Sequence, residues 1–359
     1  KVRNIYKTQL WIVDRLIFLL AFSDVLKLIK KKNNDGACII AELDGQLVGS
    51  MLVQTFEISG QKHGLIDAIV TNKSIRGKGL GKKLLKECLR WFDNNGCENI
   101  YATVERYNSR SWNLFMHTDF SLYEFKQQIS DLKAGFLKLW AKEMYFIGIG
   151  LFFLKLNKEK KQFKESTTLE HFAISFVGFS LIVLIYTLMW GNSISVFPYL
   201  IILVAVTILL HEISHSIVAK IYGLKTEFKS WIPGLFFWFL LSLLGGIYPA
   251  YGSTYMSKRD WSYVKNKRKN GLIYIIGPIV NMIIILTLYL VFPYLTIDPL
   301  KTAFGIISFI NIVILIVNLL PFRGSGGFPW DGGKIYDWNK IVWGIMVVLA
   351  ILLMVFYTL

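Results

Sequence analysis

The pattern of apolar positions changes along the chain. Up to about residue 125 short apolar runs alternate with polar ones, and beyond residue 170 long apolar runs are bounded by polar clusters. A transmembrane helix needs about 20 mainly apolar residues to cross the hydrocarbon of a bilayer. The later pattern therefore predicts five membrane spans, at about residues 171–190, 197–222, 271–295, 302–321 and 341–359.

A further apolar run, residues 231–250, is interrupted by residues that break helices. It contains Pro233, Gly234, Gly245, Gly246 and Pro249. Irregular backbone at membrane depth is tolerated only where protein or a cavity covers it. We therefore predict that this run is a re-entrant or hairpin element beside the five spans.

The first part of the chain alternates strand and helix signals. Two apolar runs flank Asp44-Gly45, a dipeptide typical of tight hairpin turns. The pattern predicts strands at 37–42, 47–54, 64–71 and 99–105, and helices at about 82–94 and 109–117. The fold expected is therefore an α/β domain over residues 1–125, followed by a polytopic α-helical membrane domain over residues 171–359.

Between these two domains we expect a basic juxtamembrane linker over residues 126–170. The segment is rich in lysine, and its one apolar piece, residues 144–154, is too short to span a bilayer comfortably. That piece is either a last strand of the first domain or a segment at the membrane interface.

Charge and cysteine usage narrow the setting of the protein. The net charge is +16, which in a soluble protein would favour nucleic acid as a partner, but most basic residues lie just outside the apolar runs. The positive-inside bias of membrane proteins accounts for them, so we expect no nucleic acid and a multi-pass protein of the cell membrane with a cytoplasmic N-terminal domain. Cys38, Cys88 and Cys97 all lie in the first domain, and their odd number favours free thiols in a reducing compartment.

The second predicted span contains His-Glu-Ile-Ser-His at residues 211–215. Positions i and i+4 of a helix share one face, so His211 and His215 are able to bind one metal ion. Glu212 lies beside them, where it is able to act on a metal-bound water. The alternative is that these residues lie near the interface and meet lipid headgroups. Ionisable groups at the centre of a membrane helix cost about 2.5–3.5 kcal/mol each, which favours a functional site.

A catalytic zinc needs three protein ligands and one open position. The remaining histidines lie in the first domain or at the start of the first span. The best third ligand is Asp331 in Pro-Trp-Asp-Gly-Gly, residues 329–333, which follows Asn-Leu-Leu-Pro, residues 318–321, at the end of the fourth span. The alternative for Asp331 is that it only forms an Asp-Gly turn. Asp337 is a weaker candidate for the third ligand.

Residues 170–359 resemble the site-2 protease family of intramembrane zinc metalloproteases. The histidine motif matches the first motif of the family, and Asn-Leu-Leu-Pro followed by Trp-Asp-Gly-Gly matches the second, with Trp330 in place of the usual leucine. Gly-Pro-Ile-Val-Asn, residues 277–281, matches a third segment, in which the asparagine faces the active site. The resemblance implies the zinc ligands His211, His215 and Asp331, the general base Glu212, and Asn281 either as an oxyanion donor or in an interhelical hydrogen bond.

The activity that this resemblance implies is cleavage of transmembrane or juxtamembrane segments of membrane proteins within the lipid bilayer. The run 231–250 would supply a strand edge that holds an unwound substrate, as in β-augmentation. Two alternatives are a membrane-anchored N-acetyltransferase and a non-catalytic chaperone-like or transport protein.

The alternative of acetyl transfer arises from Arg-Gly-Lys-Gly-Leu-Gly, residues 76–81, between the strand 64–71 and a helix. Glycines let backbone N–H groups turn toward a phosphate, and a helix N-terminus favours negative charge. The motif has neither the Walker nor the dinucleotide-binding spacing. It fits instead the element order of the first domain, which resembles the GNAT acetyltransferase superfamily over about residues 1–125.

The GNAT resemblance implies binding of acetyl-CoA, CoA or another acyl-CoA. The residues that would contact the cofactor are Arg76, Gly77, Lys78, Gly79, Leu80 and Gly81 at the pyrophosphate and Asn108 near the pantetheine arm. Phe115 stands where the family often has a tyrosine that acts as general acid. The sequence therefore predicts cofactor binding and leaves acetyl transfer open, with Asp67 or Glu105 as a possible base.

Overall fold

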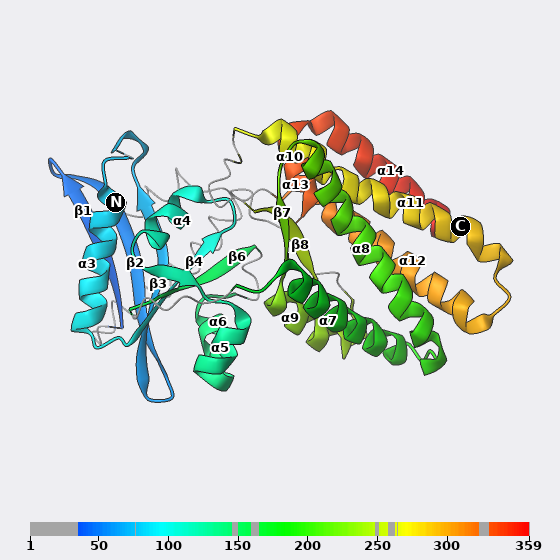
Figure 1. The fold of residues 1–359 in the computed structure, drawn as a ribbon, viewed down its shortest axis with the longest axis horizontal. Coiled ribbons are helices and arrows are strands. Elements are labelled where there is room, and N and C mark those ends of the chain that lie inside the picture. The colour runs from blue at the N-terminus through cyan, green and yellow to red at the C-terminus, as the bar shows by residue number, and fades with distance from the viewer. Residues whose placement is uncertain are drawn as a thin grey trace. The chain divides into compact units, whose positions relative to one another are not determined.

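The chain folds into two compact units. The computed structural model describes residues 35–75, 77–145, 150–158, 165–247, 251–257, 263, 265–322 and 330–358. The first unit takes residues 1–145 and 151–165, and the second takes residues 146–150 and 166–359 (Figure 1).

A six-stranded sheet forms the first unit, with strand order β1-β2-β3-β4-β6-β5. The neighbours β3 and β4 are parallel and the other pairs are antiparallel. The predicted hairpin between β1 and β2 is present, and Asp44 and Gly45 both have the positive φ that such a turn requires. The strands are β1 (Gly36–Leu43), β2 (Gln46–Ile58), β3 (Gln61–Thr71), β4 (Asn99–Glu105), β5 (Phe120–Leu122) and β6 (Leu151–Leu156).

Helices α3 (Leu80–Asn94) and α4 (Ser109–Met116) pack on the sheet through apolar side chains at helical spacing. Leu84, Cys88 and Phe92 lie one turn apart along α3 and are buried against the strands. Helices α5 (Phe125–Leu132) and α6 (Phe136–Lys142) follow β5, and short 3-10 helices lie at Lys73–Ile75 and Lys133–Gly135.

The structure differs from the linker expected over residues 126–170. Helices α5 and α6 occupy its first part, and β6 pairs with both β4 and β5 inside the sheet. Trp140 of α6 is buried and donates to Gln128 of α5 at 2.7 Å, so this segment has packing of its own. The sequence prediction missed these helices because their short apolar stretches lie among many lysines. The apolar piece 144–154 contains the start of strand β6.

Among its described residues the second unit contains five helices that are long and apolar enough to cross a membrane, as the sequence predicts. The candidate spans are Thr168–Met189, Ile194–Ile221, Lys267–Tyr294, Asp298–Asn318 and Lys340–Tyr357. The corresponding helices are α7 (Thr168–Met189), α8 (Phe197–Ile221), α11 (Ile276–Val291), α12 (Asp298–Asn318) and α14 (Lys340–Thr358). Shorter helices are α10 (Lys267–Tyr274), α13 (Asp331–Trp338) and the 3-10 turns at Ile194–Val196 and Phe292–Tyr294.

The interior of this unit holds polar as well as apolar side chains, and its outer surface is largely apolar. Polar side chains from several spans are buried, among them Thr207, His211, Asn281 and Asn311. Large apolar side chains face outward from the same helices, for example Val177, Ile202, Ile217, Ile283, Leu290, Ile341 and Val348. A lipid solvent accounts for this arrangement, because apolar surface needs no burial in hydrocarbon and polar groups do. The chain is a multi-pass membrane protein.

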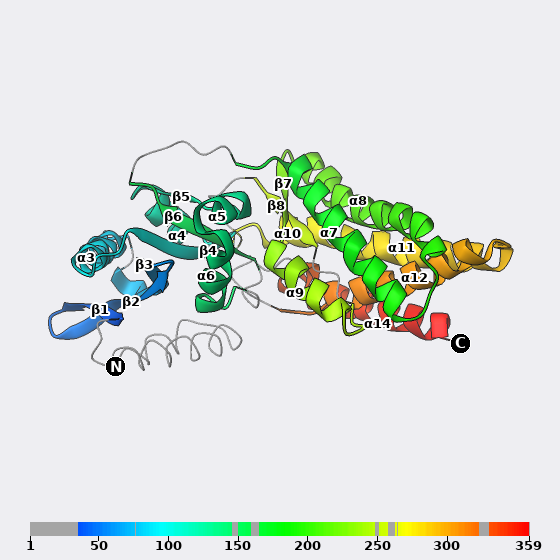
Figure 2. The ribbon, with the colours of Figure 1, turned by 90° about the horizontal axis from the view of Figure 1, so that it is seen from below.

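The interrupted run 231–250, described as far as residue 247, contains a short helix that lies between two strands in the chain. Helix α9 (Ile232–Ser242) lies between β7 (Thr226–Ser230) and β8 (Gly252–Met256), which pair antiparallel as a two-stranded sheet. Helix α7 contacts both α9 and β7 (Figure 2). Pro233 lies in the first turn of α9, where its missing N–H breaks no helical bond, so the run begins as a helix. The strand edges therefore flank this run and do not lie within residues 231–247.

Candidate metal centre

Helix α8 carries the histidine motif in its second half. The spacing of His211 and His215 puts both imidazoles on the inner face of the helix, where they are 2% and 1% exposed. Glu212 is equally buried, at 3%. Helical geometry alone brings the two histidines to one face of α8, and Glu212 follows His211 in the same turn.

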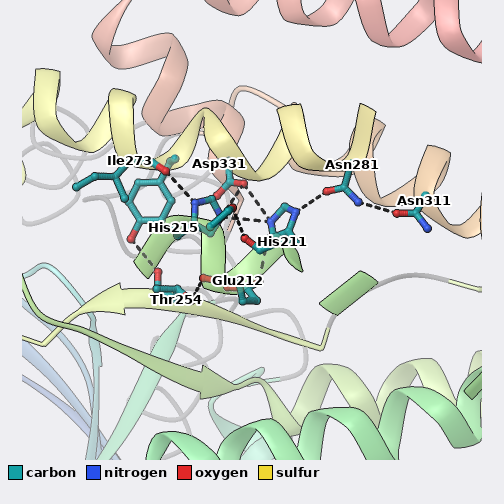
Figure 3. A network of polar contacts seen from close by, with 10 residues as sticks. His211, Glu212, His215, Thr254, Ile273, Asn281, Asn311 and Asp331 are labelled. Atoms are coloured by element: carbon teal, nitrogen blue, oxygen red, sulfur yellow. Dashed lines mark hydrogen bonds and ion pairs between the residues drawn. The ribbon is translucent and has the colours of Figure 1, made fainter. Parts of the chain in front are cut away.

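Asp331 reaches the histidines from a distant part of the sequence. It begins α13, and the next residue, Gly332, lies against the end of α12: a Cβ added to Gly332 would lie 2.3 Å from the carbonyl carbon of Leu319. Because Gly332 has no side chain, α13 is able to begin close to the backbone of Leu319. Asp331 is thereby placed with its Oδ2 atom 3.4 Å from Nε2 of both histidines (Figure 3).

These three atoms have the spacing of ligands around zinc. The two Nε2 atoms are 3.3 Å apart, so the triangle that they form with the Asp331 oxygen has sides of 3.3, 3.4 and 3.4 Å. Bonds of about 2.0–2.1 Å to a tetrahedral zinc require ligands about 3.3–3.4 Å apart. Among the described residues, His211, His215 and Asp331 form the one group of at least three potential ligand residues with such proximity.

Hydrogen bonds on the far side of each imidazole direct a lone pair to the centre of the triangle. Nδ1 of His215 lies 2.9 Å from the carbonyl oxygen of Ile273, which only accepts, so this nitrogen donates. Nδ1 of His211 donates in the same way to Asn281. Both Nε2 atoms are then unprotonated and face Asp331 Oδ2, which no hydrogen-bond donor of the described residues reaches. Three acceptors in contact are unfavourable without a cation between them, and neutral imidazole and carboxylate are zinc ligands.

Glu212 is placed beside the ligands and does not belong to them. Its Oε1 atom lies 4.0 Å from Nε2 of His211. Its other oxygen, Oε2, is buried and has no hydrogen-bond partner among the residues that the structure describes. A carboxylate in this position is able to accept a proton from a water held at the centre.

Three neighbours of the site did not emerge from the sequence. Thr254 of β8 donates through its hydroxyl to the backbone oxygen of Glu212 at 3.4 Å, and Tyr274 donates to the backbone oxygen of Thr254 at 2.8 Å (Figure 3). The ammonium of buried Lys334 lies 3.6 Å from the centroid of the Tyr274 ring. These contacts attach β8 and α13 to the helix that carries the histidines. A lysine one turn after Asp331 was the only signal in the sequence.

Two further residues predicted from the sequence, Asp337 and Asn281, lie outside the ligand group. Asp337 accepts a hydrogen bond from Tyr263 at 3.2 Å and is not part of the ligand group. Asn281 uses its oxygen for His211, and its amide nitrogen donates to Asn311 at 2.8 Å. For Asn281 this geometry favours the interhelical hydrogen bond over an oxyanion donor.

In the first unit the glycine-rich turn leads into the N-terminus of α3. Gly77 and Gly79 have φ values of 84° and 77°, a left-handed conformation that other residues rarely adopt, and Gly79 is the N-cap of α3. No side chain of the described residues caps the helix at this end. Lys78 is exposed, Leu80 and Gly81 begin the helix, and Arg76 lies outside the described residues.

Other residues predicted from the GNAT resemblance have structural contacts. Asn108 caps α4 by accepting a hydrogen bond from the backbone of Ser111 at 3.2 Å. Phe115 is buried in the core. Asp67 accepts a hydrogen bond from Gln54 at 2.7 Å. The parallel pairing of β3 with β4 covers residues 63–66 and 99–102, although both strands continue beyond it.

Comparison with known proteins separates the same two parts. The profile described as the acetyltransferase (GNAT) family matches residues 10–120, and that of peptidase family M50 matches residues 199–304. A protein of Methanocaldococcus jannaschii named as a zinc metalloprotease is 30% identical over 177 residues, which are 49% of this chain and 81% of that protein. A second zinc metalloprotease of the same organism is 31% identical over 166 residues, 45% of this chain and 40% of its own length.

The chain is also similar to solved structures of acetyltransferases. An acetyltransferase of the GNAT family from Streptococcus pneumoniae has a TM-score of 0.25 and 21% identity, and the match covers 27% of this chain and 59% of that one. An IAA acetyltransferase from Bacillus cereus has a TM-score of 0.25 and 16% identity, over 36% of this chain and 83% of its own.

Proposed function

The chain belongs to peptidase family M50, and from this premise we propose that its membrane domain, residues 171–359, is a zinc endopeptidase. Its substrates would be membrane proteins, cut in transmembrane or juxtamembrane segments. The observation that carries the proposal is the triangle of His211, His215 and Asp331 side-chain atoms, whose sides match those of ligands around a tetrahedral zinc.

His211, His215 and Asp331 would hold the zinc, a set of three protein ligands such as catalytic zinc sites have. When bound, zinc supplies Lewis-acid chemistry and lowers the pKa of a water to about 7. Glu212, whose Oε2 atom has no hydrogen-bond partner among the described residues, would accept the proton of the attacking water and return it to the nitrogen of the leaving amine. The low exposure of Glu212 keeps bulk water from competing for that proton.

The two-stranded sheet is the element we propose for holding substrate. A substrate helix has its carbonyl groups in internal hydrogen bonds, so it must unwind before its backbone is attacked. Pairing with an edge of the β7–β8 sheet would keep the unwound segment extended. Thr254 of β8 contacts the backbone of Glu212, which brings this sheet to the catalytic residues.

For the orientation we propose that the N-terminal domain lies in the cytoplasm. The residues that support it are basic and lie near ends of spans that would then face the same side: Lys220, Lys225, Lys265, Lys267, Arg268 and Lys269. Basic residues are enriched on the cytoplasmic side of membrane proteins.

We further propose that the GNAT-like domain, residues 1–125 in the sequence prediction, binds acetyl-CoA, CoA or another acyl-CoA. It would sense this ligand or recruit substrate for the protease. The left-handed Gly77 and Gly79 before an uncapped helix support it, because backbone N–H groups at such a turn bind phosphate. Calorimetric titration of the full chain with CoA tests this proposal. We expect the wild type to bind CoA and Lys78→Glu to bind it more weakly. A wild type that does not bind CoA would contradict the proposal.

The protease proposal is tested by the zinc content of the detergent-purified chain. We expect about one zinc per chain in the wild type and in Glu212→Gln, and a sharp loss in Asp331→Ala, because Asp331 belongs to the ligand set and Glu212 does not. Glu212→Gln is the matched control, since it changes a buried acid beside the site and leaves the ligand set intact. A folded wild type that stays free of zinc after loading would contradict the proposal.

A further inference from the structure

A ladder of polar side chains runs from the metal centre across three spans. Asn281 on α11, Asn311 on α12 and Thr207 on α8 are 0%, 0% and 2% exposed. Asn281 Nδ2 donates to Asn311 Oδ1 at 2.8 Å (Figure 3). Asn311 Nδ2 in turn lies 3.1 Å from Thr207 Oγ1. Polar groups inside a membrane bundle are costly and need a reason, and packing of the spans alone does not require two amides in series.

The direction of this ladder is fixed at its far end. Asn311 Nδ2 also lies 2.9 Å from the backbone oxygen of Ile307, and a carbonyl oxygen only accepts. The amide nitrogen of Asn311 must therefore point to Ile307, and its oxygen must point to Asn281. Asn281 then presents its nitrogen to Asn311, and its oxygen is left for His211.

The orientation of the Asn281 amide determines the tautomer of His211 at the metal centre. An oxygen of Asn281 beside Nδ1 of His211 requires that this nitrogen carries the proton. Nε2 of His211 is then the atom with the lone pair, and it faces His215 and Asp331. If the Asn281 amide were turned round, its N–H would meet Nδ1, the proton would move to Nε2, and the lone pair toward the site would be lost.

We propose that Asn311 is a positioning residue of the zinc centre, which fixes the tautomer of His211 through Asn281 without contact to metal or substrate. This inference rests on the proposed zinc site. Partners of a ligand histidine typically contribute 10–100-fold to metal affinity. Asn311 acts one bond farther out, so we expect its loss to weaken zinc binding by about tenfold.

The experiment is a zinc affinity measurement by chelator competition on the full chain in detergent. Asn311→Leu keeps the approximate size and removes both hydrogen-bonding functions, so affinity should fall about tenfold. Asn311→Asp, neutral at this buried position, keeps an oxygen for Asn281 and an O–H for Ile307, so affinity should stay within about threefold. Ser308→Ala is the control, because Ser308 is buried on the same helix and lies outside the ladder.

A second measurement separates positioning from general loss of structure. Because Asn311 acts only through Asn281, adding Asn311→Leu to Asn281→Leu should cause no further loss of zinc affinity. Thermal unfolding of every variant reports whether it is folded, and Asn311→Ser, too short to reach Asn281, replaces the leucine variant if that one does not fold.

Unchanged affinity in folded Asn311→Leu, an equal loss in Asn311→Asp, or additive losses in the double variant would each overturn the proposal. A folded wild type that binds no zinc is a different outcome, since it contradicts the protease function on which the inference rests.

Discussion

Replacement of Gly277 by alanine should disrupt the metal centre from the side of α11. A Cβ added at Gly277 would lie 2.6 Å from Cε1 of His211 and from both Cε1 and Nε2 of His215. Carbon atoms in contact prefer about 3.5–4.0 Å, so the two rings would have to move by about 1 Å. Metal–ligand distances vary by only about 0.2 Å in real sites, so the displacement is several times what the ligand set tolerates.

Neither ring is free to make room for the methyl group. His211 donates to Asn281 and His215 donates to Ile273, and both imidazoles are buried. We therefore expect Gly277→Ala to lose most of its zinc and to lose about 1–3 kcal/mol of stability from overpacking.

The assay is zinc content after chelation and reloading, with thermal unfolding of the same samples in detergent. Gly344→Ala is the control, because Gly344 lies in the span α14 and an added Cβ there meets no atom within 4 Å. A Gly277→Ala protein with the zinc content and affinity of the wild type would refute the close approach of α11 to the histidines.

Three further predictions address other parts of the molecule. Gly332→Ala should also lose zinc, because its Cβ would lie 2.3 Å from the backbone of Leu319 and shift the start of α13; zinc content that equals the wild type would contradict this. Burial raises the pKa of Cys97 to about 11 and that of Cys88 further, so at about pH 8 Cys97 should be alkylated about a hundredfold more slowly than an exposed thiol and Cys88 more slowly still, as mass spectrometry of native and unfolded protein would show. Burial also raises the pKa of Glu143 well above its usual range, so the folded protein holds a proton that the unfolded chain releases above about pH 4.3, and stability falls as pH rises from there toward the raised value. Glu143→Gln should remove this dependence, and thermal unfolding at about pH 5 and about pH 8 should show a smaller difference than in the wild type; an equal difference would assign the pH dependence to other groups.

The sequence by itself determined the class of the protein and the main candidate residues. Spans are set by the length of apolar runs, which is a local property, and all five were placed within a few residues. The spacing of His211 and His215 needs only helical geometry to bring both imidazoles to one face. Asp331 was identified because it follows the end of a span, and the structure brings it to the same point.

Only the tertiary structure decided what holds these residues in place. The lysine-rich segment after residue 125 became part of the first unit because β6 finds partners in β4 and β5, and pairing partners are not visible in the segment itself. Asn311 meets Asn281 and Thr207 across 30 and 104 residues of sequence, so no local pattern marks it as part of the centre. The direction of a hydrogen bond between helices and the close approach of one helix backbone to another depend on how the helices pack. Neither is visible in the sequence of a single helix.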